Sequence, residues 1–500
     1  MARTKGSEEL FNLVHSLTPE EKGYYKKFAR RHIPNGSNYL KLFDAVAAQH
    51  TFEEASLREK FKNYAVMKVY LKDYITDGLL LYYKNKHPHV NLFSQIQKIH
   101  ILLVKGQYSE SLRVLKKSIA QSRQMELFSV ERYLLRVLSE INHHRLANAG
   151  AITEFYRQYD NDLKENWSKE NDLTEWELMS TKWFAKVRGL DIFDKALPNI
   201  DINSMRSKKA LSTRSEIKKL NGLSYMHYLR KDMKSKFETG KQQLELSEEF
   251  QREGDPSFNN VYIRNNHITS SLYLEKFDTA LQQASDMLNA ETQSGFYYHL
   301  AFPKSVLFKL DTYFQLGRFD EGLELLNEVN LQMVKICTGL GDFTALKEYY
   351  FYKHVFLFVN RLYRECWMDM QSIQLKKLEA NYEIDFTDYS MLQLMVQFEM
   401  GHYSNVRKMA GKAEAAFGKL KVKDGTYLAL LDFFKNVTAA NSKTLALTTF
   451  AAIKKYYKAN KLTDRKAFGL LDYTTWLKVV AEVRYVKDIL DEKAALQKMK

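Results

Sequence analysis

Residues 272–281 read Leu-Tyr-Leu-Glu-Lys-Phe-Asp-Thr-Ala-Leu, and residues 314–323 read Phe-Gln-Leu-Gly-Arg-Phe-Asp-Glu-Gly-Leu. Both stretches place an aromatic residue after a short polar break and a small residue, Ala280 or Gly322, three positions later. Apolar residues with helical spacing lie on either side of the break. The pattern predicts a helix, a tight turn and a second helix. The aromatic side chain would fill the gap between the helices, and the small residue would let their backbones approach closely.

The same group of an aromatic residue, two polar residues and a small residue recurs along the chain. Further copies are Tyr108-Ser-Glu-Ser111, Phe237-Glu-Thr-Gly240, Tyr363-Arg-Glu-Cys366 and Tyr403-Ser-Asn-Val406. From Phe237 to Tyr403 the aromatic residues are 40, 42, 44 and 40 positions apart, and Tyr108 precedes Phe277 by 169, which is four periods of about 42. This regularity predicts an array of helical repeats.

The pattern resembles the tetratricopeptide repeat, whose helix pair carries Gly, an aromatic residue and then Ala around its turn, as in Gly317-Arg-Phe319-Asp-Glu-Gly322. The period of about 42 is longer than the 34 residues of that family, and its regular proline is missing. The resemblance implies an all-α, right-handed α-α superhelix, and more loosely a role in peptide binding. Residues 16–29 also resemble the opening of some uncharacterised bacterial helical proteins, a likeness that implies no function.

Three segments are expected: an N-terminal helical cap at 1–86, the repeat array at 91–415 and a basic C-terminal helical cap at 416–500. The first cap is predicted to hold helices near 7–16, 19–31, 38–49, 52–62 and 64–85, with capping boxes at Thr18 and Thr51. His87-Pro88-His89 would separate this cap from the array and is interpreted as a linker rather than a metal site.

The array is expected to be weakest at 140–235, where Phe193-Asp-Lys-Ala196 fits the register but Pro198 would shorten the second helix. In the C-terminal cap, helices are predicted near 425–437, 442–459 and 463–495. Terminal repeats are expected to be atypical because they cover the end of a stack.

The distribution of charge, the cysteines and the lack of long apolar runs narrow the class of protein. The net charge of +15 is concentrated at the ends, with +5 on residues 1–86 and +11 on residues 401–500. The two cysteines, Cys337 and Cys366, are predicted to be buried thiols in a reducing compartment. With no signal-peptide pattern and no apolar run of 18 residues, the chain is expected to be cytoplasmic and not inserted in a membrane.

The usual sequence anchors of catalysis are missing. There is no phosphate-binding Gly-x-x-x-x-Gly-Lys-Ser/Thr loop, no Gly-x-Gly-x-x-Gly after a strand, no His-Glu-x-x-His and no Gly-x-Ser-x-Gly. We therefore expect no enzyme activity, no cofactor and no metal. An enzyme whose site is built from residues distant in sequence stays an open alternative.

The resemblance suggests where a partner would bind. In the tetratricopeptide family the first helix of each pair lines the concave face, at about 15, 12 and 8 residues before the turn aromatic. The equivalent residues here include Leu307, Phe351 and Val355 and six candidates for partner binding: Tyr262, Asn265, Thr269, Lys304, Asp311 and Lys347. Their hydroxyl, amide and charged groups could clamp a peptide backbone or a carboxylate; ordinary exposed polar residues are the alternative.

A second candidate surface is the basic and aromatic patch of the C-terminal cap. It comprises Lys454, Lys455, Lys458, Arg465 and Lys466, with Tyr456 and Tyr457 among them. Such a patch is typical of a solvated helix face, or of a nucleic-acid site in which the tyrosines stack on bases. The sequence thus favours a non-catalytic scaffold that binds a protein or peptide, with a nucleic-acid-binding regulator as an alternative. It leaves the oligomeric state and the partner's identity open.

Overall fold

The structure is a computed structural model that describes residues 8–33, 36–145, 149–187, 202–256, 258, 260–294, 298–373, 386–419, 424–460, 466–467 and 471–482. It divides into two compact units, Met1–Ile263 and Arg264–Lys500. The boundary falls inside one helix, α13, and within the predicted array. The predicted division into two caps and a central array stays a prediction.

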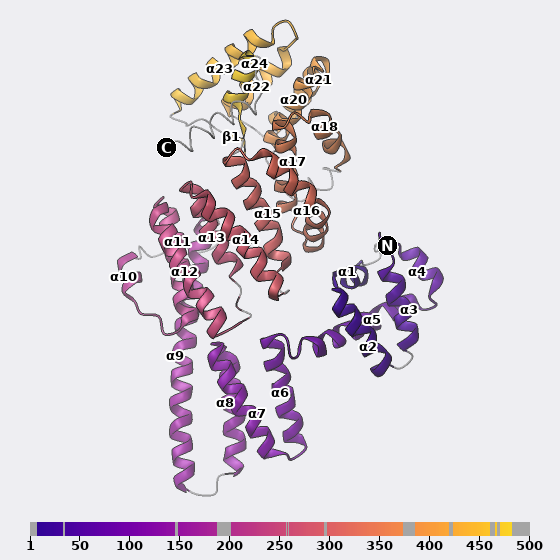
Figure 1. Ribbon diagram of the computed structural model, residues 1–500. Helices are drawn as coiled ribbons and strands as arrows, with labels where there is room; N and C mark the ends of the chain where they lie inside the picture. The colour runs from indigo at the N-terminus through magenta and orange to yellow at the C-terminus, as the bar shows by residue number, and fades with distance from the viewer. Residues whose placement is uncertain are drawn as a thin grey trace. The chain divides into compact units, whose positions relative to one another are not determined.

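Helices make up almost all of the described residues in both units (Figure 1). The helices of unit 1 are α1 (Glu9–Ser16), α2 (Pro19–His32), α3 (Gly36–Ala47), α4 (Glu54–Lys60), α5 (Tyr64–Tyr83), α6 (Pro88–Val104), α7 (Tyr108–Gln124), α8 (Phe128–Arg145), α9 (Ala149–Val187), α10 (Ile202–Ser207), α11 (Thr213–Leu229) and α12 (Met233–Glu253). Helix α13 (Val261–Tyr273) crosses the boundary. Unit 2 continues with α14 (Phe277–Ser294), α15 (Tyr298–Gln315), α16 (Phe319–Leu340), α17 (Phe343–Val359), α18 (Tyr363–Ser372), α20 (Phe386–Glu399), α21 (Tyr403–Lys419), α22 (Gly425–Asn436), α23 (Ser442–Ala459), β1 (Lys466–Ala467), β2 (Leu471–Asp472) and α24 (Tyr473–Glu482).

The helices pack in chain order. In unit 2, each helix from α14 to α18 contacts the next, as does each from α20 to α24, and α18 contacts α20. First helices of successive pairs also touch one another, since α15 contacts α17, α17 contacts α20 and α20 contacts α22. Stacked helix pairs of this kind define a helical repeat protein, and the predicted all-α, solenoid-like class is confirmed.

A repeated turn geometry explains the repeated sequence pattern. In eight turns of the described chain, a residue with positive φ stands two positions before the next helix begins: Gly106, Glu126, Lys231, Glu275, Gly317, Gly341, Arg361 and Gly401. The following residue donates its backbone N–H to the carbonyl five positions earlier, for example Arg318 N to Tyr313 O at 2.8 Å. This is the Schellman arrangement, which satisfies the last carbonyls of one helix and reverses the chain into the next.

The small residue of the repeated group has the predicted role. Ala280 is fully buried, and a Cβ atom built on Gly322 would lie 1.9 Å from Cε1 of Phe356. The aromatic position is less uniform than predicted. Phe319 is buried and packs against Phe314 and Phe356, with ring centroids 5.5 and 6.3 Å away. By contrast, Phe277 is only half-buried.

The register assigned to Phe237 is wrong by about one turn. Helices α7, α14, α16, α18 and α21 begin at the aromatic residue, as predicted, but α12 begins at Met233. The turn residue Lys231 stands two positions before Met233, as its counterparts do in the other repeats. Met233 is therefore the equivalent position, and it precedes Phe277 by 44 residues, within the observed range of spacings.

The N-terminal helices agree with the predictions and share a core that includes Tyr25, Phe43 and Leu71. Thr18 caps α2 with the predicted capping box, accepting a hydrogen bond from Glu21 N at 3.2 Å. The box predicted at Thr51 does not form, because the N-cap of α4 is Glu53. His87-Pro88-His89 is not a linker: Pro88 opens α6, and His89 contacts Asp255 at 3.2 Å.

Two other predicted regions differ from the structure. Helix α9 is a single helix of 39 residues through part of the region expected to be weak (Figure 1). The helix predicted at 463–495 is wrong at its start, because Lys466–Ala467 pairs with Leu471–Asp472 as antiparallel strands and α24 begins only at Tyr473. The group Phe193–Ala196 lies outside the described residues.

Both cysteines are buried free thiols, as predicted. Burial raises the pKa of Cys337 to about 12, so its thiol stays protonated at neutral pH. Among the helices described, none combines the length and apolar character needed to cross a membrane.

Candidate functional site

A cavity of about 690 Å³ lies in unit 1. We call it the α9–α11 groove. Four segments supply its lining: Leu173, Glu177, Ser180, Thr181 and Phe184 from α9; Arg214, Ile217, Lys218, Asn221 and Tyr225 from α11; Gln243 from α12; and Phe258, Tyr262 and Ile263 at and before the start of α13. The positions on α9 recur every three or four residues and so form one helical face.

Aromatic rings border the groove. Phe184 and Tyr225 contact each other across α9 and α11, with ring centroids 5.7 Å apart. Tyr262 is 59% exposed and Phe184 is 41% exposed, so both present large surfaces to a ligand. Phe258 is held by the guanidinium of Arg214, whose Cζ lies 5.3 Å from the ring centroid. Exposed aromatic groups that are fixed by neighbours are typical of binding surfaces.

The groove also holds a buried hydrogen-bond acceptor that has no donor among the described residues. Gln243 is only 1% exposed, and its Nε2 donates to the carbonyl of Ile217 at 3.0 Å. Its Oε1 accepts no hydrogen bond within the described part of the chain. A buried carbonyl without a donor costs about 1–3 kcal/mol. A ligand N–H would recover that amount only if the groove opens enough to admit it, because this oxygen is closed to solvent in the structure.

The remaining polar residues are partnered or exposed. Asn221 Nδ2 donates to Ser180 Oγ at 2.7 Å, and Lys218 pairs with Glu177 at 3.3 Å. No histidine is among the residues that line the groove. The lining offers amide, hydroxyl, charged and apolar groups to a ligand.

The six predicted partner-binding residues are divided between the two units. Tyr262 belongs to unit 1 and lines the α9–α11 groove. The other five belong to unit 2 and are half-buried: Asn265 and Thr269 on α13, Lys304 and Asp311 on α15, and Lys347 on α17. Their role in binding stays a prediction.

Contacts within unit 2 limit what some of these residues can offer. The hydroxyl of Thr269 donates to the carbonyl of Asn265 at 2.8 Å. Asp311 is hydrogen-bonded to Tyr352; burial, the carboxylates of Asp311 and Glu348, and this bond raise the pKa of Tyr352 well above its ordinary value.

Two further residues assigned to the concave face are in the core. Phe351 is 5% exposed and Val355 is fully buried, so neither can contact a ligand in this state. The first helices of successive pairs contact each other here, which buries side chains that a more open repeat would expose.

The basic patch is only partly described. Lys455 and Lys458 are exposed on α23, while Lys454 is half-buried, with Nζ 5.8 Å from the ring centroid of Phe450. Lys466 lies in β1, and Arg465 is outside the described residues. Tyr457 is 3% exposed and belongs to the core of unit 2, so of the two tyrosines proposed to stack on bases only the half-buried Tyr456 is left.

Sequence reasoning missed a buried polar chain in unit 2. Asp369 on α18 accepts hydrogen bonds from Lys353 Nζ at 2.7 Å and from His354 Nε2 at 2.9 Å, both on α17. The other ring nitrogen of His354, Nδ1, lies 3.2 Å from the hydroxyl of Tyr389 on α20. Since an ionised Asp369 can only accept, the neutral imidazole donates through Nε2 and accepts from Tyr389.

The electrostatics of this chain stabilise the neutral imidazole. Burial lowers the pKa of His354, and the hydrogen bond to Asp369 offsets only part of that effect. Burial alone would raise the pKa of Asp369, but the hydrogen bonds from His354 and Lys353 outweigh it and lower the pKa. Burial raises the pKa of Tyr389 and of Cys366, so neither is an activated nucleophile.

A polar chain of this kind gives a weak signal in a single sequence, because its residues come from three different helices. The adjacent Lys353-His354 pair, within a stretch of α17 that is otherwise aromatic and apolar from Tyr349 to Val359, is the one local sign of a buried polar partner. For metals, the described residues contain no group of three or more His, Cys, Asp or Glu side chains able to hold an ion.

Comparison with models of protein families, with curated proteins and with solved structures finds no match for this chain. The helical repeat class therefore rests on the fold described above.

Proposed function

We propose that this chain is a non-catalytic, cytoplasmic scaffold of tetratricopeptide-like repeats that binds an extended segment of a protein partner. The observation that carries the proposal is the unused acceptor Oε1 of Gln243, buried in a groove bordered by exposed aromatic rings. A peptide supplies both things the groove lacks, a backbone N–H for this oxygen and an apolar side chain to lie between Phe184, Tyr225 and Tyr262.

The alternatives have less support. A nucleic-acid site on α23 would keep the exposed Lys455 and Lys458 but not the stacking ring of Tyr457. An enzyme with a cryptic site would need an accessible base, whereas His354 is fully buried.

Peptide display against the purified full chain tests the proposal. Selected peptides are measured by fluorescence anisotropy with the wild type and with Tyr262→Ala and Gln243→Met. We expect each variant to weaken binding about tenfold or more, since loss of an aromatic contact or of a buried hydrogen bond costs about 1–2 kcal/mol.

Two further variants locate the site. Tyr108→Ala removes another exposed tyrosine of unit 1, on α7 outside the groove, and should leave affinity unchanged. The double change Asn265→Ala and Lys304→Ala tests the residues predicted in unit 2. If this double variant loses peptide binding while Tyr262→Ala keeps the wild-type affinity, the site lies in unit 2. Failure to select any peptide would contradict the proposal.

A further inference from the structure

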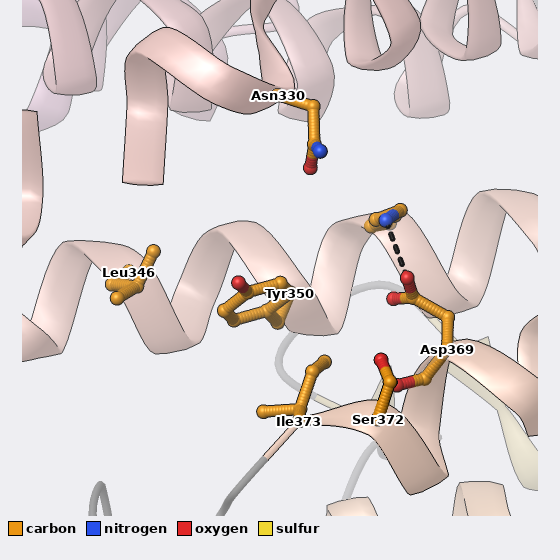
Figure 2. Close-up of a pocket in the computed structure, with 7 residues that line it drawn as sticks. Asn330, Leu346, Tyr350, Asp369, Ser372 and Ile373 are labelled. Carbon is orange, nitrogen blue, oxygen red and sulfur yellow. Dashed lines mark hydrogen bonds and ion pairs between the residues drawn. The ribbon is translucent and has the colours of Figure 1, made fainter. Parts of the chain in front are cut away.

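A second cavity, in unit 2, lies beside the buried polar chain and is distinct from the peptide groove. Its volume of about 370 Å³ falls within the range of small-molecule sites, roughly 300–1,000 Å³. Figure 2 shows Asn330 on α16 pointing toward the side formed by α17 and α18, from which Tyr350 and Asp369 come. Leu346 and Ile373 supply apolar surface to the same cavity.

The carboxylate of Asp369, the strongest hydrogen-bond acceptor in the cavity lining, already accepts hydrogen bonds from the protein. One oxygen of Asp369 accepts from Lys353 and the other from His354, as the dashed line in Figure 2 shows for Lys353. The positive charge of Lys353 offsets the negative charge of Asp369, and the buried imidazole is neutral. The carboxylate therefore repels an incoming anion far less than a bare Asp would.

Three residues of the cavity lining have hydrogen-bond donors that are only partly used within the protein. The ammonium of Lys353 has three N–H groups and gives one to Asp369. Asn330 Oδ1 lies 3.1 Å from the hydroxyl of Tyr349; whichever amide atom faces that hydroxyl, at least one N–H of Asn330 is left over. The hydroxyl of Tyr350 donates to no acceptor within the described residues.

We propose that this cavity binds a small organic carboxylate. Its two oxygens would accept from Lys353, Asn330 and Tyr350, and a short alkyl chain would lie against Leu346 and Ile373. A carboxylate offers about four lone-pair sites to this surplus of donors, twice as many as a neutral carbonyl. A phosphate offers as many sites but leaves the apolar surface uncovered.

Ligand-observed NMR with butyrate tests the site, with butyramide and inorganic phosphate as separate arms. We expect saturable binding of butyrate to the full chain with a Kd in the millimolar range, and at least tenfold weaker binding of butyramide and of phosphate. Equal or tighter binding of either of these, or no saturation by 50 mM butyrate, would overturn the proposal.

Variants confirm the location. Asn330→Asp replaces the amide donor with a negative charge at nearly constant volume and should abolish butyrate binding. Tyr350→Phe removes only one hydroxyl and should weaken it about threefold to tenfold, which keeps the test valid if the first variant folds poorly. Asn327→Asp adds the same charge one turn earlier on α16, at an exposed position outside the lining, and is the matched control. Unchanged binding in both cavity variants would contradict the assignment.

Discussion

At the scale of single residues, the packing of the repeats depends on a few aromatic contacts that are not equivalent. Phe319 is 2% exposed and contacts Phe314 and Phe356, whereas Phe277 is half-buried at the same repeat position. We expect Phe319→Ala to cost about 3–5 kcal/mol and Phe277→Ala about 1–2 kcal/mol in unfolding free energy. Thermal or denaturant unfolding measures both. Equal losses would mean that the two rings are buried alike.

Acid sensitivity should follow from His354. Burial lowers its pKa in the folded chain below the value of about 6.5 expected when unfolded, so its contribution to stability is complete above pH 6.5 and is lost as the pH falls through that value toward the folded pKa. The groups that face it are Asp369 on α18, Tyr389 on α20, and Lys353 and Tyr350 on its own helix. The lowered pKa of Asp369 acts in a separate window, below about pH 4.

The variant His354→Gln isolates this effect, because glutamine can still donate to Asp369 but does not titrate. We expect the fall in unfolding midpoint between pH 7 and pH 5 to be smaller in His354→Gln than in the wild type. His50→Gln, at an exposed position, is the control. Desolvation also lowers the pKa values of His87, His227 and His299, so these residues will keep part of the pH dependence in the variant. An unchanged profile in His354→Gln would contradict the assigned proton positions.

Sequence reasoning found the residues that repeat but not their individual environments. The small residue of each group must be buried wherever two helices approach closely, so its role follows from the pattern alone. The burial of an aromatic ring depends on what the next pair places against it. Phe356 covers Phe319, and that neighbour lies 37 positions away in the sequence.

At the scale of structural elements, the Schellman turn is the unit that repeats most faithfully. Gly317 and Glu275 occupy the same position in successive turns, with φ of 70° and 57°. A side chain strains this conformation by about 1–2 kcal/mol, while glycine adds unfolded-state entropy of about 0.5–1 kcal/mol.

Substitutions at these two turns should therefore have opposite signs. We expect Gly317→Ala to lower stability by about 1 kcal/mol and Glu275→Gly to raise it by up to about 1 kcal/mol. Gly339→Ala, inside α16 with no atom within 4 Å of the added Cβ, is the control and should be neutral or stabilising. A loss of stability in Glu275→Gly would show that the turn is not strained by its side chain.

Element boundaries were predictable where local chemistry determines them. Thr18 with Pro19 and Glu21 set the start of α2. The start of α12 was misplaced because Lys231, not glycine, makes its turn, and a lysine gives no turn signal. The long helix α9 was not predicted because part of its length is stabilised by packing against α11, which follows only after a further segment of the chain.

At the scale of the whole molecule, the two units carry different candidate sites. Unit 1 holds the α9–α11 groove, and unit 2 holds the buried polar chain and the smaller cavity. Of the groove lining, sequence reasoning found Tyr262, through the resemblance to tetratricopeptide repeats. It missed the residues of α9 and α11, which lie in the region at 140–235 where the repeat pattern is weakest. It missed Gln243 because a buried acceptor without a donor has no sequence signature.

Hydrogen–deuterium exchange of the full chain, with and without the tightest peptide from the display selection, tests the central claim most directly. The groove account predicts slower amide exchange in residues 173–184 of α9, in α11 and around Gln243, with α22 and α23 unchanged. Slower exchange confined to unit 2, or to the basic helix α23, would contradict the assignment of the peptide-binding site to the α9–α11 groove.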